Sequence, residues 1–198
     1  IGPVTVLLKE GEKLPSNKRI YSLSPDAQLQ LNTILQFMEK IGIVSRSQEH
    51  LRQNRQGVPV FVIPRKNNYA RVLIDFSEIN ECFIMPAQCL PQIDNSLHFL
   101  NSFGLVTLLD LANAYYSIEL DENSKKHMTF LTKESAWQMN RLPTGLASSP
   151  IYYADILEKI LHYDVIFDEK GNIVKENGKA KMIRNPIPFV QAYRSEEH

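Results

Sequence analysis

The chain has 198 residues, of which 43% are hydrophobic and 22% are charged, a composition typical of a globular protein with a sizeable core. Its 22 basic and 22 acidic residues balance, so net charge does not indicate a nucleic-acid partner and local basic clusters must decide. The longest apolar runs fall far short of the roughly 20 residues of a membrane span, and the first residues do not resemble a secretory leader. We therefore expect an intracellular protein, in the cytoplasm or nucleus, that is neither secreted nor bound to a membrane.

Residues 1–23 combine a short β-prone run with glycine, proline and several basic residues, a pattern that indicates an extended N-terminal arm. Residues 24–26, Ser-Pro-Asp, then supply an N-cap, a proline for the first helical position and an acid for the first turn. Apolar residues follow at helical spacing, so we expect a helix over 25–41 that ends at Gly42. The polar, arginine-rich stretch 45–56 predicts a loop.

Two strands are expected at 58–63 and 70–74, and the residues between them form a hairpin with a basic tip. Arg65 and Lys66 lie at this tip, and Arg71 lies on the second strand. Guanidinium groups donate paired hydrogen bonds to phosphate oxygens and an ammonium group adds a point charge, so these residues could clamp a polyphosphate. A solvated hairpin tip without a ligand is the alternative.

The region 75–91 is irregular, and apolar spacing predicts a helix over 93–103. The apolar run 106–109 predicts a buried strand, which ends at the carboxylate of Asp110. The residues alone allow two roles for Asp110. It could cap the short helical segment that follows, or it could be a ligand of a metal ion such as Mg²⁺.

The second half of the chain begins with two further strands, at 128–132 and 136–141, joined by a tight turn. A Leu-Pro-Thr-Gly turn over 142–146 follows, and Ser149 is placed to cap a second amphipathic helix. The two amphipathic helices and the central strand at 106–109 suffice for an α+β core.

The last part of the sequence alternates apolar and charged residues over 163–185 around two turn signals. This pattern predicts a solvated hairpin inserted between the second helix and a last strand at 187–193. A charged tail, 194–198, completes the sequence.

Five segments, taken in order, resemble the fingers and palm of the reverse transcriptases of retroviruses and long-terminal-repeat retrotransposons, the Gypsy-like pol family. They are the helix start at 24–25, PVFVIPRK at 59–66, RVLIDFSEIN at 71–80, LLDLANAY at 108–115 and LPTGLASSP at 142–150. The resemblance implies the right-hand polymerase fold without a thumb, with an antiparallel palm sheet packed on helices.

The resemblance also divides the chain into subdomains. The N-terminal arm, 1–23, would be followed by a fingers subdomain made of 24–84 and 120–147. The palm would be made of 85–119 and 148–193, with the hairpin 163–185 inserted in it and the tail 194–198 after it.

Site residues are carried over from the family by position. Arg65, Lys66 and Arg71 would bind the triphosphate of an incoming dNTP. Asp110 would be a catalytic residue that binds Mg²⁺, or Mn²⁺ in its place, with the backbone carbonyl of Leu111 beside it. The partners implied are a primer–template of RNA or DNA and the dNTP, without a membrane.

Two further positions would shape the nucleotide site. Tyr115 would occupy the volume where a ribose 2′-hydroxyl would lie, although packing in the core is the alternative for this aromatic residue. Gly145 would let the backbone approach the nucleotide, because glycine has no Cβ to collide with it. Many family members carry Gln or Phe where this chain has Thr144, which is shorter.

The family's pair of adjacent aspartates is missing. Residues 189–193 reach the strand on which the pair is expected, but Arg194 and Ser195 follow, and no Asp-Asp pair occurs in the sequence. A two-metal site needs carboxylates that bridge both ions, so Asp110 alone does not complete it. We expect this chain to be inactive as a polymerase as it stands. A non-catalytic relative that binds nucleic acid or a protein partner, or that joins an oligomer, is the alternative.

Overall fold

The computed structural model describes residues 2–14, 20–47, 57–64, 70–87, 110–165, 168, 170, 172, 174–176, 179–180 and 182–184. The chain forms two units, one made of 1–86 and 111–149 and the other of 87–110 and 150–198. In the described ranges the fold is of the α+β type, with a mixed sheet of five strands and four α-helices. The elements predicted at 93–103, 106–109 and 187–193 lie outside the described residues. The antiparallel palm sheet and the subdomain division therefore stay predictions.

Helix α1, Pro25–Lys40, confirms the helix predicted from the start signal. The Ser24 hydroxyl accepts a hydrogen bond from the Ala27 amide at 3.3 Å, and Pro25 fills the first turn, where its missing N–H costs nothing. The helix ends before Gly42, whose φ of +76° is the left-handed conformation that glycine adopts without strain.

The sheet of the first unit has the strand order β1-β5-β4-β2-β3. Its strands are β1 (Val44–Arg46), β2 (Val58–Pro64), β3 (Ala70–Ile74), β4 (Thr129–Leu131) and β5 (Ala136–Met139). Neighbouring strands are antiparallel except β2 and β4, which are parallel. The four strands predicted in these regions are confirmed. Strand β1 was not predicted, because two of its three residues belong to the stretch 45–56, for which a polar loop was expected.

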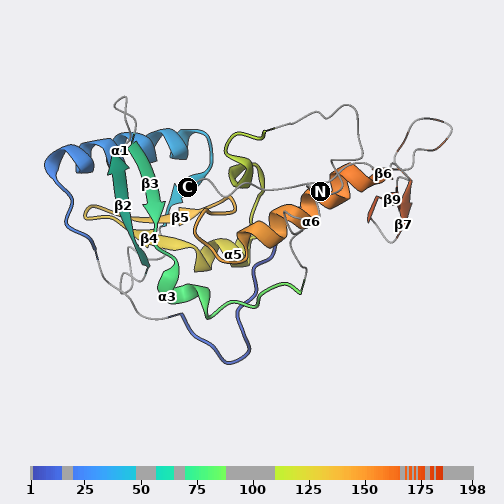
Figure 1. Ribbon diagram of the computed structural model, residues 1–198, viewed down its shortest axis with the longest axis horizontal. Coiled ribbons are helices and arrows are strands. Elements are labelled where there is room, and N and C mark those ends of the chain that lie inside the picture. Colours follow the sequence, from blue (N-terminus) through green and yellow to red (C-terminus); the bar gives the residue numbers. More distant parts are fainter. Residues whose placement is uncertain are drawn as a thin grey trace, which may run out of the picture. The chain divides into compact units, whose positions relative to one another are not determined.

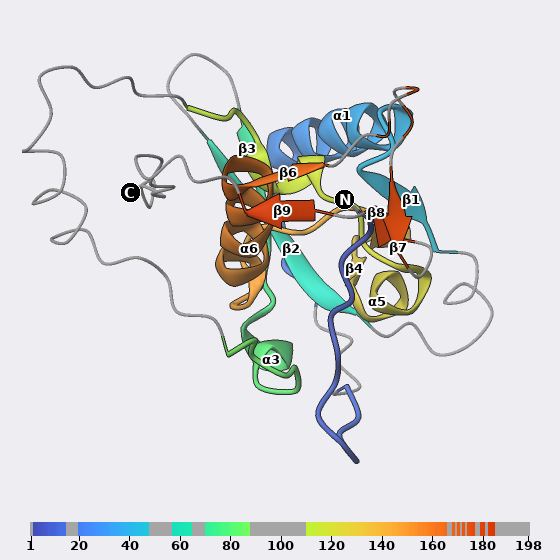
Figure 2. The same cartoon turned by 90° about the vertical axis from the view of Figure 1, so that its right-hand side faces the viewer.

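Helix α1 packs against the sheet and contacts β1, β2 and β3 (Figures 1 and 2). Its buried side chains, Leu31, Leu35 and Met38, recur at the spacing of one helical face. On the sheet, Phe130 and Met139 are fully buried. The core of the first unit therefore lies between one face of α1 and the strands.

The N-terminal arm is extended and is held at two points. Val4 pairs with Leu120 in parallel, and Leu8 pairs with Phe83 in antiparallel fashion. Between these points the Ser124 hydroxyl accepts a hydrogen bond from the Val6 amide at 2.7 Å, and Figure 2 shows the arm passing α5.

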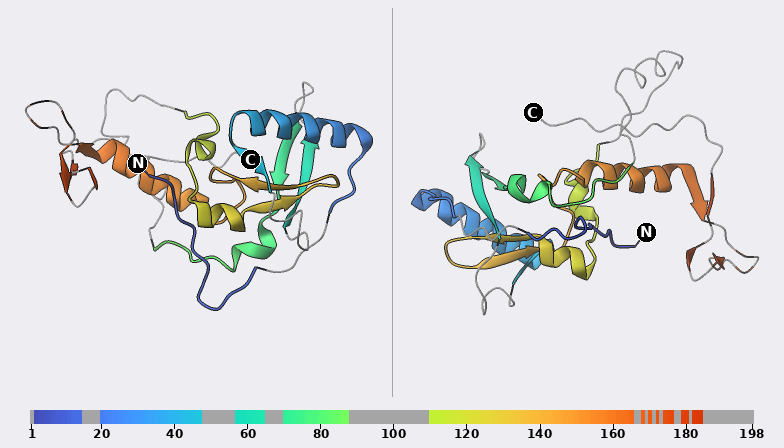
Figure 3. Two further views of the ribbon diagram at one scale, coloured as in Figure 1. Left: turned by 180° about the vertical axis from the view of Figure 1, so that it is seen from behind. Right: turned by 90° about the horizontal axis from the view of Figure 1, so that it is seen from below.

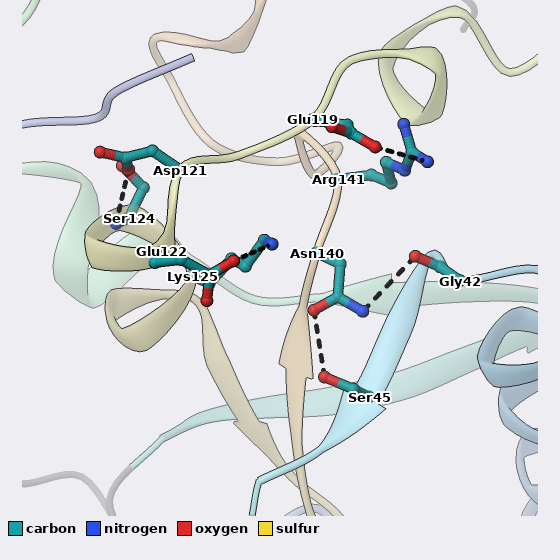
Figure 4. Close-up of polar contacts among 9 residues, drawn as sticks. All are labelled: Gly42, Ser45, Glu119, Asp121, Glu122, Ser124, Lys125, Asn140 and Arg141. Carbon is teal, nitrogen blue, oxygen red and sulfur yellow. Dashed lines mark hydrogen bonds and ion pairs between the residues drawn. The ribbon is translucent and has the colours of Figure 1, made fainter. Parts of the chain in front are cut away.

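Two short helices in the first unit were not predicted. Helix α5, Glu122–His127, begins where Asp121 Oδ1 accepts a hydrogen bond from the Ser124 amide at 2.8 Å (Figure 4). Helix α3, Ser77–Asn80, lies in the region 75–91, for which irregular structure was expected. Helices of one or two turns carry too little periodicity to be recognised from sequence.

The second unit contains most of α6, Ser149–His162, which runs directly into strand β6, Tyr163–Val165 (Figure 3). Strand β6 pairs with β9, Met182–Arg184, and the shorter strands β7 (Lys175–Glu176) and β8 (Lys179–Ala180) pair with each other. Both pairs are antiparallel and lie within the region predicted as an inserted hairpin.

Candidate nucleotide site

The Leu-Pro-Thr-Gly turn lies against the C-terminal end of β3. Gly145 has a φ of +93°, and a Cβ at this position would lie 3.1 Å from the carbonyl oxygen of Ile74. Asn80 holds the turn from one side: its Nδ2 donates to the Gly145 carbonyl at 3.2 Å, and its Oδ1 accepts from the Ala147 amide at 2.9 Å. Glycine is therefore required here by the fold itself, in addition to any role beside a ligand.

The segment that carries Asn80 is itself fixed by a carboxylate. Asp75 Oδ1 accepts hydrogen bonds from the amide and the hydroxyl of Ser77, at 3.1 and 2.6 Å. Asp75 Oδ2 accepts from the Tyr21 hydroxyl at 3.1 Å, and the Tyr21 ring packs edge-on against Phe61 of β2 at 5.9 Å between centroids. These contacts fix the start of α3 relative to the sheet, so that Asn80 meets the turn.

Tyr115 lies on the 3-10 helix η1, Ala114–Ser117, and its side chain is buried, with 7% exposed. The helix begins after Asn113, the one non-glycine residue with a positive φ, 51°, in the described part of the chain. Asparagine tolerates this left-handed conformation better than most residues. The burial of Tyr115 agrees with the core-packing alternative, and its role as a gate stays a prediction.

The segment after η1 pairs with the segment that leads into the Leu-Pro-Thr-Gly turn. The Leu142 amide donates to the Ile118 carbonyl at 2.9 Å, and Glu119 and Arg141 form an antiparallel bridge whose side chains meet as an ion pair at 3.0 Å (Figure 4). This pairing therefore fixes the segment that follows Tyr115 beside the segment that leads to Gly145.

Asn140, next to this pairing, joins three segments of the first unit. Its Oδ1 accepts from the Ser45 hydroxyl at 3.0 Å, and its Nδ2 donates to the Gly42 carbonyl at 3.4 Å (Figure 4). Asn140 therefore ties the loop after α1 to the end of β5.

Asp110 is exposed and forms no hydrogen bond or ion pair with the described residues. Its alternative role as a helix cap is wrong, because η1 starts four residues later with Asn113 at the N-cap position. The side chain of Leu111 is 56% exposed. Within the described ranges no group of three His, Cys, Asp or Glu residues could hold a metal ion. Asp110 and Leu111 thus offer a single carboxylate, which does not fit a site for two divalent cations.

The predicted phosphate clamp is described only in part. Arg71 is half-buried on β3 and lies opposite Ile63 of β2. It precedes Ile74 by three residues, roughly 10 Å along the strand, and an odd separation places the two side chains on opposite faces. Arg65 and Lys66 lie outside the described residues.

Sequence reasoning missed the role of Asn80 and misplaced that of Ser149. Asn80 belongs to a segment that carries the family resemblance, but its partners lie 65 and 67 residues further along the chain. Ser149 is the first residue of α6, and its hydroxyl donates to the Pro143 carbonyl at 2.6 Å. It therefore closes the turn.

The helices that the described ranges contain are all too short or too polar to cross a membrane. No protein-family model matches the chain. The retrovirus-related Pol polyprotein from transposon 297 of Drosophila melanogaster is 28% identical over 175 aligned residues, which cover 77% of this chain and 16% of that protein. The corresponding polyprotein from transposon 412 of the same species is 29% identical over 160 residues, covering 75% of this chain and 12% of that protein. The chain is thus a distant homologue of retrotransposon Pol polyproteins and spans less than a fifth of their length.

Proposed function

We propose that the chain is the fingers and part of the palm of a reverse transcriptase, an RNA-directed DNA polymerase that adds dNTPs to a primer 3′-hydroxyl. Distant homology to retrotransposon Pol polyproteins supports the proposal. The observation that carries it is the Leu-Pro-Thr-Gly turn, which Asn80 holds at the end of β3 and which is hydrogen-bonded to the segment behind Tyr115.

In this proposal each part of the site has one task. Arg71 would bind the triphosphate, because a guanidinium group donates two parallel hydrogen bonds to phosphate oxygens. Tyr115 would exclude the 2′-hydroxyl of a ribonucleotide. Gly145 would let the backbone of the turn lie beside the base or the primer terminus, because only glycine combines this φ with so close an approach to β3.

The metal site is the incomplete part. Asp110 and the carbonyl of Leu111 would contribute to binding Mg²⁺ or Mn²⁺. The family's Asp-Asp pair would supply the other carboxylates, and this sequence does not contain such a pair. We expect no polymerisation by the pure 198-residue protein.

A non-catalytic relative that binds nucleic acid or a protein partner is the second candidate. The incomplete carboxylate set favours it, because loss of metal ligands abolishes phosphoryl transfer without removing the basic residues that contact phosphates.

The test measures binding of a fluorescent primer–template at increasing salt concentration, together with extension of the primer. The reverse transcriptase and a non-catalytic relative that binds nucleic acid both predict binding whose logarithm falls linearly with the logarithm of salt concentration, because bound cations are released from the phosphates. Template-dependent extension would show that the metal site is complete after all. Absence of both nucleic-acid and dNTP binding would refute the reverse-transcriptase proposal.

Two arginines on the outer strands of the sheet provide a matched pair of variants. Arg71→Ala, on β3, should weaken dNTP binding by about tenfold or more, since a charge-assisted hydrogen bond contributes about 1.5–3 kcal/mol. Arg46→Ala should leave dNTP binding unchanged, because Arg46 lies on β1, the strand of the sheet that is furthest from β3. Equal effects of the two substitutions would indicate nonspecific charge attraction.

A further inference from the structure

Helix α1 has an exposed face that carries large apolar side chains. Leu29 is 68% exposed, Phe37 is 61% exposed, and Ile41, just past the end of the helix, is 49% exposed. These side chains lie away from the face that packs on the sheet. Leu29 and Phe37 are eight residues apart and Ile41 follows four residues later, so these exposed side chains form a stripe, which is typical of a surface that pairs with another helix.

The residues along this stripe repeat symmetrically about its centre. Asp26, Leu29, Thr33, Phe37 and Lys40 follow one another at intervals of 3, 4, 4 and 3 residues, all of which keep them on one face. Thr33 stands at the midpoint, and its hydroxyl donates to the Leu29 carbonyl at 3.0 Å. The polar group at the centre of the stripe is therefore satisfied within its own helix.

We propose that two copies of this chain pair through α1, with the helices antiparallel and a two-fold axis at Thr33. In this arrangement Leu29 of each copy faces Phe37 of the other. The same symmetry places Asp26 of each copy opposite Lys40 of the other. Such a contact is isologous, since residue i meets residue j and residue j meets residue i.

The complementary charges at the two ends of the stripe favour a second copy as the partner, and they favour the antiparallel orientation. Asp26 and Lys40 are both exposed, and neither forms an ion pair within the part of the chain that the structure describes. A parallel pair would bring like charges together at both ends of the stripe. An antiparallel pair brings opposite charges together and also aligns the two helix dipoles favourably.

The expected association is weak and reversible. One pair of helices with a few apolar contacts buries less than the about 1,200 Å² of a standard interface, so we expect a Kd of about 10–100 µM. The inference does not rest on the proposed function, since the stripe uses none of the residues assigned to nucleotide binding.

The test uses two charge-reversal variants of the full 198-residue chain in sedimentation equilibrium, without nucleic acid or nucleotide. Asp26→Lys creates two Lys–Lys contacts in the pair, and Lys40→Asp creates two Asp–Asp contacts. Each variant alone should dimerise at least tenfold more weakly than the wild type. An equimolar mixture of the two should dimerise again, because every contact in the mixed pair joins a lysine to an aspartate.

Controls separate pairing from damage to the helix. Circular dichroism of each variant checks that α1 remains folded, and the comparison of mixed with separate samples uses the same two proteins. Phe37→Glu should make the chain monomeric, whereas Ile160→Glu, at a 56% exposed residue of α6, should not. A wild type that stays monomeric well above the expected Kd would overturn the proposal. So would a mixture that fails to associate, or equal effects of the two glutamate substitutions.

Discussion

Replacing Gly145 with alanine should destabilise the first unit more than the same change at any open turn. The new Cβ would lie 3.1 Å from the Ile74 carbonyl oxygen, a backbone atom that moves only if β3 moves. The φ of +93° adds conformational strain of about 1–2 kcal/mol, and relieving the close contact costs about 1–2 kcal/mol more. We expect the free energy of unfolding to fall by about 2–4 kcal/mol.

Gly42 provides a matched control. It has a φ of +76°, but a Cβ there would meet no atom within 4 Å. Gly42→Ala should therefore cost only the strain, about 1 kcal/mol. Both variants are measured by urea denaturation followed through the fluorescence of Trp137, the one tryptophan of the chain, which lies on β5 in the first unit. Equal losses of stability at the two glycines would refute the steric argument.

Three further predictions concern single side chains of the first unit. Asn80→Ala should lower the free energy of unfolding by about 2 kcal/mol in urea, because it removes two hydrogen bonds that hold the turn. Ser149→Ala should cost about 1 kcal/mol through its lost bond to Pro143, whereas Ser148→Ala should change stability by less than about 0.5 kcal/mol, since the buried Ser148 hydroxyl has no partner among the described residues. Burial lowers the pKa of His127 below 6.5, so stability should be full above pH 6.5 and fall as the pH drops through the folded-state pKa. Urea titrations across pH should show a flatter profile for His127→Gln, and an unchanged profile would contradict this assignment.

The pattern of successful predictions follows the range of the interactions involved. Helix α1 was predicted because Ser24, Pro25 and Gly42 act within one turn of the residues they affect. The strands of the β2–β3 hairpin were predicted because a continuous apolar run and its antiparallel neighbour lie close together in the chain.

The elements that were missed depend on distant partners. Strand β1 is a strand because it pairs with β5, with Val44 opposite Met139, and nothing within residues 44–46 indicates that pairing. Asn80 is an ordinary polar residue until the fold brings it to the Leu-Pro-Thr-Gly turn. The same holds for the Ser124 hydroxyl, which meets Val6 from 118 residues away.

The sequence by itself determined the local elements of this protein, the glycines that its turns require and the ordered motifs behind the family resemblance. Local signals suffice there, because caps, turns and helical periodicity act over a few residues. The tertiary structure decided that the Leu-Pro-Thr-Gly turn lies on the end of β3, that Tyr115 is buried, and that a symmetric apolar stripe of α1 stays exposed. Each of these depends on which distant segments meet, and that is set by packing and hydrogen bonding across the whole first unit.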